Sequence, residues 1–185
     1  LNTSHTHDGP VVSQYCHHYL LAPDWPYLDL IEKRTVEAAC EAKERAVPVS
    51  VLAGSTRTRL PMSRRRPGPQ GGISFRPYPE GKTCDYLPVC LLQTRRHKPV
   101  ALLFSVACHP STVISTLFSA DYPGVACARL DAHLGSPAAM FLQGAGGDTK
   151  AAVIAQLDGQ GAPRWSSGST KQTRPIAARA GCAHR

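Results

Sequence analysis

The stretch VALLFSVACHP, Val100–Pro110, decides the fold of this chain. Residues 100–108 form a nearly unbroken apolar run of strand length, and such runs are typical of strands that are buried on both faces. His109 and Pro110 follow directly, and the proline ends the strand pairing. In α/β folds the functional groups gather at the ends of strands, so His109 is a candidate site residue. The alternative is a histidine that merely caps a strand.

A second apolar run meets a polar segment further along the chain. The run AAMFLQ, Ala138–Gln143, leads without a break into GAGGD, Gly144–Asp148. The glycines allow a ligand to approach the backbone closely, and the N–H groups can hold an oxyanion or a phosphate. The segment lacks the G-K-[ST] ending of a P-loop, and a tight turn is the alternative interpretation.

Two histidines stand near the start of the chain in TSHTHDGP, Thr3–Pro10. On an extended strand His5 and His7 point to the same side, because side chains alternate from face to face. Imidazole is the commonest metal ligand, so the pair suits one metal, or one metal and one catalytic imidazole. A pair of surface histidines in a loop is the alternative. Together with the two strand ends, this motif predicts a single pocket.

Helices and strands alternate along the rest of the sequence, which predicts an α/β fold with mixed sheets flanked by helices. Asp24 is a candidate N-cap with Pro26 near the first helical position, Asp121 is a possible second N-cap, and Gly135 fits a helix C-terminus. Residues 60–83 are dense in proline, glycine and arginine and predict a long loop. The predicted elements are helices over 26–46 and 123–134 and strands over 47–57, 87–93, 100–108 and 138–143.

Composition limits the classes of function. The chain has 185 residues, enough for one domain with a core, and a formal net charge of +8. Its arginine clusters lack the interleaved aromatic residues of nucleic-acid-binding modules, so no nucleic-acid partner is expected. The seven cysteines include no C-x-x-C pair, which argues against zinc ribbons and thioredoxin-like motifs. No apolar run is long enough for a transmembrane helix.

The sequence predicts one domain over residues 1–157 and a different character beyond it. From Asp158 the chain has little apolar periodicity and much Gly, Ser, Arg and Ala, so residues 158–185 are expected to be disordered or unrelated sequence. The first residue, Leu1, stands directly before the paired histidines, which suggests a piece of a longer protein. The domain is therefore expected to be incomplete.

Four motifs occur in an order that resembles a known enzyme family. They are SHTHDGP, LFSVACHPST, SADYPG and FLQGAGGD. Together they resemble the N-terminal catalytic domain of the neutral/alkaline, non-lysosomal ceramidases. The segments LPMSRRRPGPQGG and PEGKTCDYLPV are similar to the uncharacterised bacterial branch of that family, and the resemblance covers about residues 1–150.

The resemblance implies a zinc-dependent hydrolase that cleaves the N-acyl bond of ceramide, or of a related lipid or amide, into an amine and a fatty acid. By motif, His5 and His109 would bind Zn²⁺, and His7 would face the substrate as a polar or proton-transferring group. Zinc chemistry suits this reaction, because the ion acidifies a bound water and polarises the amide carbonyl. The resemblance also implies a secreted or membrane-associated protein, with association at the membrane surface.

Further candidates come from the same motifs. Asp148 is a second catalytic candidate, and Gly146, Gly147 and Arg65 are candidates for binding the substrate. Arg65 belongs to the run Arg64–Arg66, which can hold an anionic group or be a solvated loop. Asp121 is a candidate for orienting a histidine tautomer from behind.

The sequence departs from the family's pattern at three points. The segment DGPVVSQYCHH replaces the family's run of small residues and glycine after the paired histidines. The family's remaining zinc ligands, a glutamate and a tyrosine, lie beyond the last residue of this chain. Ceramidases carry a serine shortly after the G-D pair, whereas Lys150 stands there in this sequence. A truncated, inactive fragment with weak metal binding and a barrel-type amidohydrolase are the alternatives. The length of the chain and the predicted 60–83 loop argue against the barrel.

Overall fold

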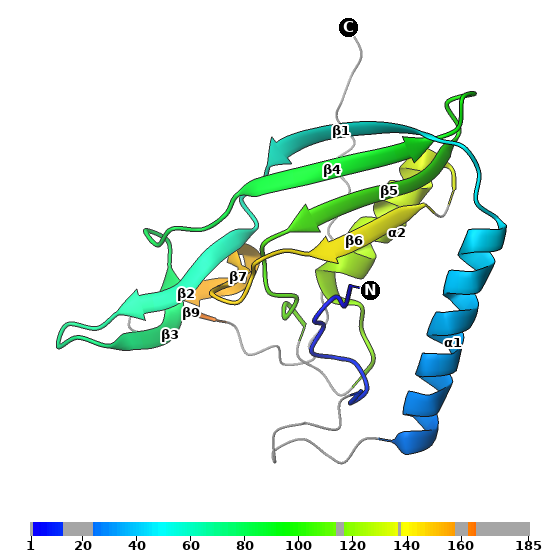
Figure 1. The fold of residues 1–185 in the computed structure, drawn as a ribbon. Coiled ribbons are helices and arrows are strands. Elements are labelled where there is room, and N and C mark those ends of the chain that lie inside the picture. The colour runs from blue at the N-terminus through cyan, green and yellow to red at the C-terminus, as the bar shows by residue number, and fades with distance from the viewer. Residues whose placement is uncertain (1, 13–23, 114–116, 137, 158–162, 166–185) are drawn as a thin grey trace, which may run out of the picture.

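The computed structural model describes residues 2–12, 24–113, 117–136, 138–157 and 163–165 (Figure 1). These residues form mixed β-sheets and two α-helices, which confirms the predicted α/β class. The helices are α1 (Trp25–Glu44) and α2 (Asp121–Leu134), and a short 3₁₀-helix spans Ala152–Ile154. The strands are β1 (Ser50–Arg57), β2 (Pro61–Pro67), β3 (Ile73–Tyr78), β4 (Tyr86–Gln93), β5 (Pro99–Val106), β6 (Ala139–Gln143), β7 (Thr149–Ala151), β8 (Ala155–Leu157) and β9 (Pro163–Trp165).

The larger sheet has four strands in the order β1-β4-β5-β6. Its strands pair in antiparallel fashion except for β5 and β6, which are parallel. Parallel neighbours need a crossover connection, and α2 supplies it between these two strands. Because β5 and β6 run in the same direction, the segments that follow them leave the sheet at the same edge (Figure 1). These are the two strand ends at which the sequence predicts site residues.

The core lies between this sheet and α2. Phe104, Val106 and Cys108 are buried there, and Phe141 on β6 meets Phe104 edge to face with ring centroids 5.6 Å apart. Tyr122 of α2 donates a hydrogen bond from its hydroxyl to the carbonyl of Cys108 at 2.7 Å. This packing anchors the segment that follows β5 and carries His109.

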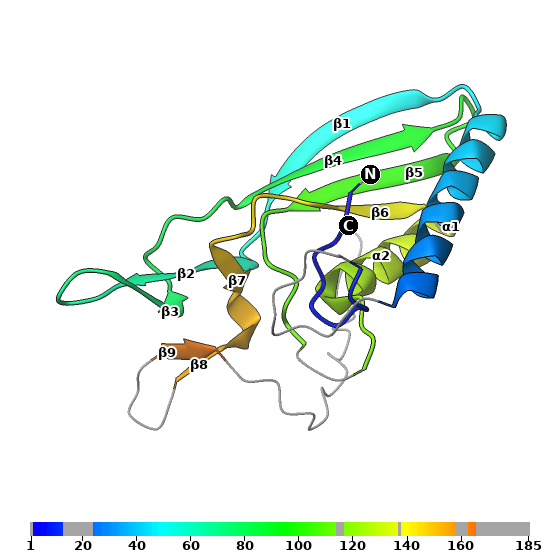
Figure 2. The same ribbon diagram turned by 60° about the horizontal axis from the view of Figure 1, so that its bottom comes forward.

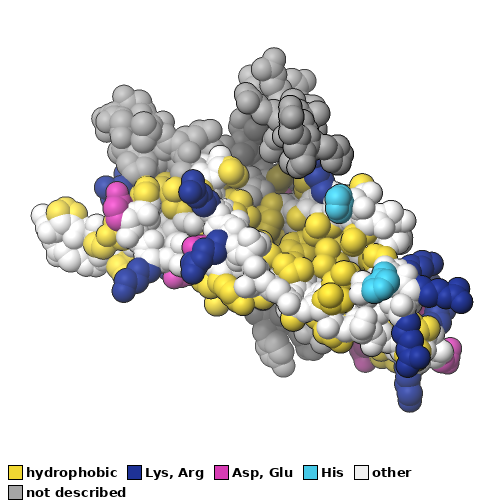
Figure 3. Space-filling view, turned by 90° about the horizontal axis from the view of Figure 1, so that it is seen from above, with side chains coloured by type: hydrophobic (Ala, Val, Ile, Leu, Met, Phe, Trp, Pro, Cys, Tyr) yellow, Lys and Arg dark blue, Asp and Glu magenta, His cyan; other side chains and the backbone are white. Residues whose placement is uncertain are grey.

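The other face of the sheet is open in the described part of the chain. Val51 on β1 and Met140 on β6 expose 63% and 53% of their surface, and Ala101, Leu103 and Ser105 on β5 are only half-buried. Figure 3 shows hydrophobic side chains at the surface on the side of the molecule where β1 lies in Figure 1. The prediction that residues 100–108 are buried on both faces is therefore wrong for the strand as described, because α2 covers only one of them.

The prediction of a long loop over residues 60–83 is also wrong. Strands β2 and β3 form an antiparallel hairpin with a register shift between Ser63 and Arg65. Gly71 and Gly72 build its turn with φ of 87° and 77°, a region that glycine adopts without strain. Proline and glycine make up most of the turn. They give the whole segment the composition of a loop, although a short strand lies on either side of the turn. Strand β7 completes a second sheet in the order β3-β2-β7, which joins the hairpin to the segment after β6 (Figure 2).

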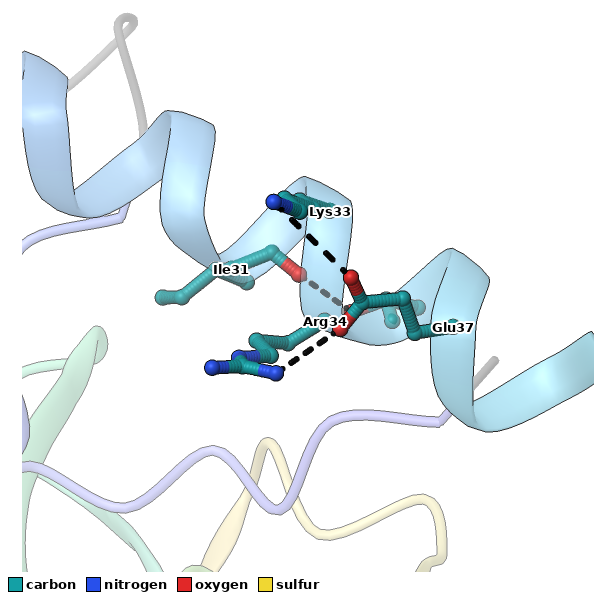
Figure 4. Close-up of polar contacts among 5 residues, drawn as sticks. Ile31, Lys33, Arg34 and Glu37 are labelled. Carbon is teal, nitrogen blue, oxygen red and sulfur yellow. Dashed lines mark hydrogen bonds and ion pairs between the residues drawn. The ribbon is translucent and has the colours of Figure 1, made fainter. Parts of the chain in front are cut away.

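The predicted N-cap of helix α1, Asp24, is confirmed. The carboxylate of Asp24 accepts a hydrogen bond from the N–H of Tyr27 at 3.1 Å, as an N-cap does. None of its residues is buried. Surface ion pairs support it: Glu37 lies 2.9 Å from Arg34 and 4.0 Å from Lys33 (Figure 4). Such exposed pairs contribute only a few tenths of a kcal/mol each.

Helix α2 begins differently from its prediction and ends as predicted. Its N-cap is Ala120, without a side-chain cap, and Asp121 is the first helical residue with φ of 50°. Asp121 is therefore not the N-cap. Its carboxylate instead accepts hydrogen bonds from the N–H groups of Thr112 and Val113. Gly135 takes the left-handed conformation of a C-terminal cap, with φ of 66°.

The tail predicted over residues 158–185 lies outside the described residues, except for β9. Strand β9 pairs with β8 in antiparallel fashion. The domain boundary at residue 157 stays a prediction. No helix among the described residues has the length and apolar character that a membrane span requires.

Asp131 ties α2 to β6, and its replacement is expected to destabilise the fold. Its Oδ1 accepts hydrogen bonds from the N–H groups of Ala138 and Ala139 at 2.8 and 2.7 Å. Asp131→Ala leaves both donors without this acceptor, so we expect unfolding to become easier by about 1–2 kcal/mol, measured by urea denaturation. Asp131→Asn keeps the carbonyl oxygen and should lose less. Equal stability of the two variants would contradict this role.

Candidate metal centre

Three imidazole rings converge at the ends of distant segments. The Nε2 atom of His109 lies 3.2 Å from that of His5 and 2.9 Å from that of His7. The candidate ligand atoms of the three residues all lie within 4.8 Å of one another. His5 and His109 are 104 positions apart in the sequence, so the tertiary fold brings them together.

These distances suit a tetrahedral metal ion. With metal–nitrogen bonds of about 2.0–2.1 Å, two nitrogen ligands of one tetrahedral ion are about 3.3 Å apart. The two printed separations, 3.2 and 2.9 Å, lie close to that value. The donor set is three neutral imidazoles, which suits Zn²⁺ and other borderline transition metals. The residues present therefore fit a bound metal ion.

A backbone carbonyl orients the His109 ring. Its Nδ1 lies 3.3 Å from the carbonyl oxygen of Gly146. A carbonyl oxygen only accepts, so Nδ1 carries the proton, and the lone pair of Nε2 faces His5 and His7. Metal-binding histidines are commonly held in this way through their other nitrogen. His109 exposes only 7% of its surface, whereas His5 and His7 are exposed.

The N-terminal segment reaches His109 in an irregular conformation. His5 has φ of 60°, so the expectation of an extended strand over the two histidines is wrong. Side-chain contacts dock the segment instead. The hydroxyl of Thr6 donates to the carbonyl of Ser119 at 2.9 Å, and Asn2 accepts from the N–H of Gln143 at 3.1 Å. Both ribbon views show this segment beside the connections that follow β5 and β6 (Figure 1, Figure 2).

The glycines after β6 allow two stretches of backbone to touch. A Cβ atom on Gly146 would lie 2.7 Å from the carbonyl carbon of Cys108 and 2.9 Å from its nitrogen. The close approach that the sequence predicts at Gly146 is thus an approach to the chain itself. A Cβ on Gly147 would meet nothing within 4 Å. A hollow of about 490 Å³ opens here, lined by Asn2, Thr3, His5, His109, Gln143, Gly144, Ala145, Gly146 and Gly147.

Asp121 and Asp148 do not belong to the cluster of His5, His7 and His109. The Asp121 carboxylate binds the backbone at Thr112 and Val113 rather than a histidine ring, although its charge weakly raises the pKa of His7. Asp148 is exposed, and its carbonyl accepts from the N–H of Arg64 at 2.9 Å. Their predicted roles stay predictions.

Arg64, not the predicted Arg65, reaches the glycine segment. Its Nε and Nη2 donate to the carbonyl oxygen of Gly147 at 3.1 and 2.6 Å. Arg65 is exposed and pairs with Phe75 across the hairpin. Because the register shifts between Ser63 and Arg65, strand alternation alone does not tell which arginine points inward.

The sequence analysis also missed Lys150 as a site residue. This lysine exposes only 6% of its surface, and its charge lowers the pKa of His7. The signal available in the sequence was its position two residues after the glycine-rich segment Gly144–Asp148. A lysine is almost never this buried unless its charge is paired.

Burial and nearby cations keep two of the imidazoles neutral. Desolvation, and then the charge of Arg64, lower the pKa of His109 to about 4. Desolvation, followed by the charges of His5, Lys150 and Arg64, lowers the pKa of His7. Neutral imidazole is the form that binds metal, so His109 stays available as a ligand down to about pH 4, and burial favours the same neutral form of His7.

This lowered pKa predicts how the metal-free protein responds to acid. The folded chain keeps His109 neutral down to about pH 4, whereas its ordinary pKa is 6.5. The contribution of His109 to stability is therefore fully present above pH 6.5 and is lost as the pH falls toward 4. An NMR titration should show a His109 midpoint near pH 4, and the urea midpoint should fall over the same interval. In His109→Gln that fall should be shallower, and an NMR midpoint at or above 6.5 would contradict the assigned environment.

Comparison with solved structures shows a ceramidase-like fold. The crystal structure of neutral ceramidase from Pseudomonas aeruginosa matches with a TM-score of 0.65 and 21% sequence identity, over 81% of this chain and 25% of that chain. A ceramidase complexed with C2 matches with a TM-score of 0.67 and 20% identity, over 83% of this chain and 25% of that one. The chain thus spans about a quarter of the length of these proteins. No protein-family model matches the sequence, and no curated protein matches it.

Proposed function

We propose that this chain carries the metal-binding part of a ceramidase-like hydrolase, and that its metal is zinc. The observation that carries the proposal is the approach of the Nε2 atoms of His5 and His7 to that of His109, with the candidate ligand atoms of the three residues all within 4.8 Å of one another. The likeness in fold to two ceramidases supports the same reaction class. The substrate is then an N-acyl amide, ceramide or a related lipid or amide, and the products are an amine and a fatty acid.

His5, His7 and His109 would hold the ion. Three protein ligands with an open fourth position are typical of catalytic zinc sites, whereas closed sets of four are typical of structural ones. When bound, zinc supplies a more acidic water and polarises the amide carbonyl. His109 is rigidly placed by Gly146, and the exposed sides of His5 and His7 leave the site open to water and substrate.

Other groups of the chain would act on the substrate. The hollow beside His5 and His109 can admit the amide. Gly147 lines it, and a Cβ there would meet nothing within 4 Å, so the backbone at this position is open to a ligand. Arg64, held by the Gly147 carbonyl, brings a positive charge that favours the negative charge developing on the amide oxygen. Asp148, and His7 if it does not bind the metal, are the candidates for moving a proton to the leaving amine.

A metal titration and a hydrolysis assay on the full chain test the proposal. We expect close to one zinc ion per chain by equilibrium dialysis, and chelator-sensitive release of fatty acid from short N-acyl amides or from short-chain ceramide. Zinc binding without turnover would support the inactive-fragment alternative. Hydrolysis that survives complete removal of metal would falsify the zinc mechanism.

His7→Ala separates its two possible roles. If His7 is a ligand, as the separation of 2.9 Å between its Nε2 and that of His109 suggests, the zinc affinity falls with the activity. If His7 only transfers protons, the affinity stays and the activity falls alone. Measuring both quantities on the same preparation assigns the residue.

A further inference from the structure

A fully buried hydroxyl lies next to the carbonyl that orients His109. Thr149 is the first residue of β7, and it exposes only 1% of its surface. Its Oγ1 lies 3.0 Å from the carbonyl oxygen of Ala107 and 3.2 Å from that of Gly146. Carbonyl oxygens only accept, so the hydroxyl is the donor in both contacts. It thus bridges the segment that follows β5 and the glycine-rich segment that follows β6.

The strand position of Thr149 does not by itself require a hydroxyl. Valine has the same β-branched shape and is equally favoured in strands. Burying a hydroxyl costs about 1–3 kcal/mol unless hydrogen bonds compensate for it. A polar side chain at so buried a position is therefore explained by its partners, and these are carbonyls of the segments that carry and orient His109.

The hydrogen bonds of Thr149 and His109 form a closed loop. The N–H of Thr149 donates to the Gly146 carbonyl at 3.2 Å, and Nδ1 of His109 donates to the same oxygen. These two donors fill the two lone pairs of that oxygen, which leaves the hydroxyl proton of Thr149 for Ala107. Ala107 stands two residues before His109 in the chain. Turning the histidine ring about its side-chain bonds would therefore break a hydrogen bond of this loop.

Strand β2 holds the same turn through other contacts. The turn spans residues 146–149. Arg64 donates from its side chain to the carbonyl of Gly147, and from its backbone N–H to the carbonyl of Asp148 at 2.9 Å. These contacts fix the turn against β2, whereas the hydroxyl fixes it against the segment that follows β5.

We infer that Thr149 is a positioning residue of the metal centre. Through its hydroxyl on Ala107 and its N–H on Gly146, it holds the carbonyl that keeps a proton on Nδ1 of His109 and leaves Nε2 free to bind the ion. The inference rests on the proposed function, because it assigns a further residue to the zinc site. Replacing a residue that supports a metal ligand commonly lowers the metal affinity about 10- to 100-fold.

Two substitutions separate the hydroxyl from the shape of the side chain. Thr149→Val keeps the branched shape and removes the donor, so the zinc affinity should fall at least about 10-fold in competition with a chromogenic chelator. Thr149→Ser keeps the donor and loses one methyl group, so its zinc affinity should stay within about three-fold of that of the unaltered chain. Unchanged affinity in Thr149→Val, or equal losses in both variants, overturns the inference.

Asp131→Ala is the control for a general loss of stability. It removes the acceptor of two backbone N–H groups between α2 and β6, away from the three histidines. Its zinc affinity should equal that of the unaltered chain, although its unfolding free energy falls by about 1–2 kcal/mol. A loss of zinc affinity as large as that of Thr149→Val would mean that stability alone causes the effect, which overturns the inference.

The tautomer of His109 gives a readout that needs neither zinc nor turnover. In the metal-free chain at neutral pH, nitrogen NMR should show the proton of His109 on Nδ1. Thr149→Val should show a mixture of the two tautomers, and Thr149→Ser should resemble the unaltered chain. If Thr149→Val does not fold, the unaltered chain decides, because a buried and bonded Thr149 hydroxyl proton exchanges slowly enough to be observed. Rapid exchange of that proton overturns the inference.

The two measurements also separate this inference from the proposed function. If the unaltered chain binds no zinc but the His109 tautomer responds to Thr149→Val, the proposed function fails and the positioning of the ring by Thr149 stands. If zinc binds and the tautomer is the same in Thr149→Val, the inference fails and the proposed function stands.

Discussion

His109→Ala is expected to lower the zinc affinity of the chain by at least about 100-fold, because one of three ligands is lost and each ligand contributes several kcal/mol. His109 should matter most of the three. Its ring is buried, and the Gly146 carbonyl fixes its direction, whereas His5 and His7 are exposed. Its lone pair is thus already aimed before the metal arrives. Competition with a chromogenic zinc chelator measures the affinity.

A histidine elsewhere on the surface provides the control. His133 lies exposed in the last turn of α2, and His133→Ala should leave the zinc affinity unchanged. Circular dichroism of both variants shows whether the fold is retained. If His109→Ala binds zinc as tightly as the unaltered chain, the three converging rings are not the metal site.

Gly146→Ala is expected to destabilise the protein by about 3 kcal/mol, at the upper end of the cost of overpacking. The new methyl group would lie 2.7 Å from the carbonyl carbon and 2.9 Å from the nitrogen of Cys108. Both are backbone atoms of the segment just after β5, and they cannot turn aside as a flexible side chain would. The segment must therefore move away, and the carbonyl that orients His109 moves with it.

This substitution thus affects stability and metal binding together. Urea denaturation should show the loss of stability, and the zinc affinity should fall even though no ligand is changed. Gly147→Ala is the matched control for stability, since its Cβ would meet nothing within 4 Å. Its unfolding free energy should stay within about 0.5 kcal/mol of the unaltered chain. Equal effects of the two substitutions would contradict the described contact.

Local patterns in the sequence predict most of the regular structure. The apolar runs that became β4, β5 and β6 and the capping residues Asp24 and Gly135 were all visible in the sequence. Residues 60–83 were not, because a hairpin with two short strands and a turn of prolines and glycines has the composition of a loop. The sequence also did not predict that β5 is buried on one face rather than on two, because an apolar run does not tell which neighbours cover it.

The candidate site, like the fold, could be predicted from the sequence only in part. The sequence by itself determined which residue types can bind a metal and that His109 stands at a strand end. Only the tertiary structure decided that His7 joins His5 and His109, that Gly146 orients the ring, and that Arg64 rather than Arg65 faces the site. The physical reason is that local sequence governs backbone conformation, whereas a one-residue register shift reverses which side chains face inward. Contacts between residues 104 positions apart depend on how the whole sheet assembles, and no short stretch of the chain contains that information.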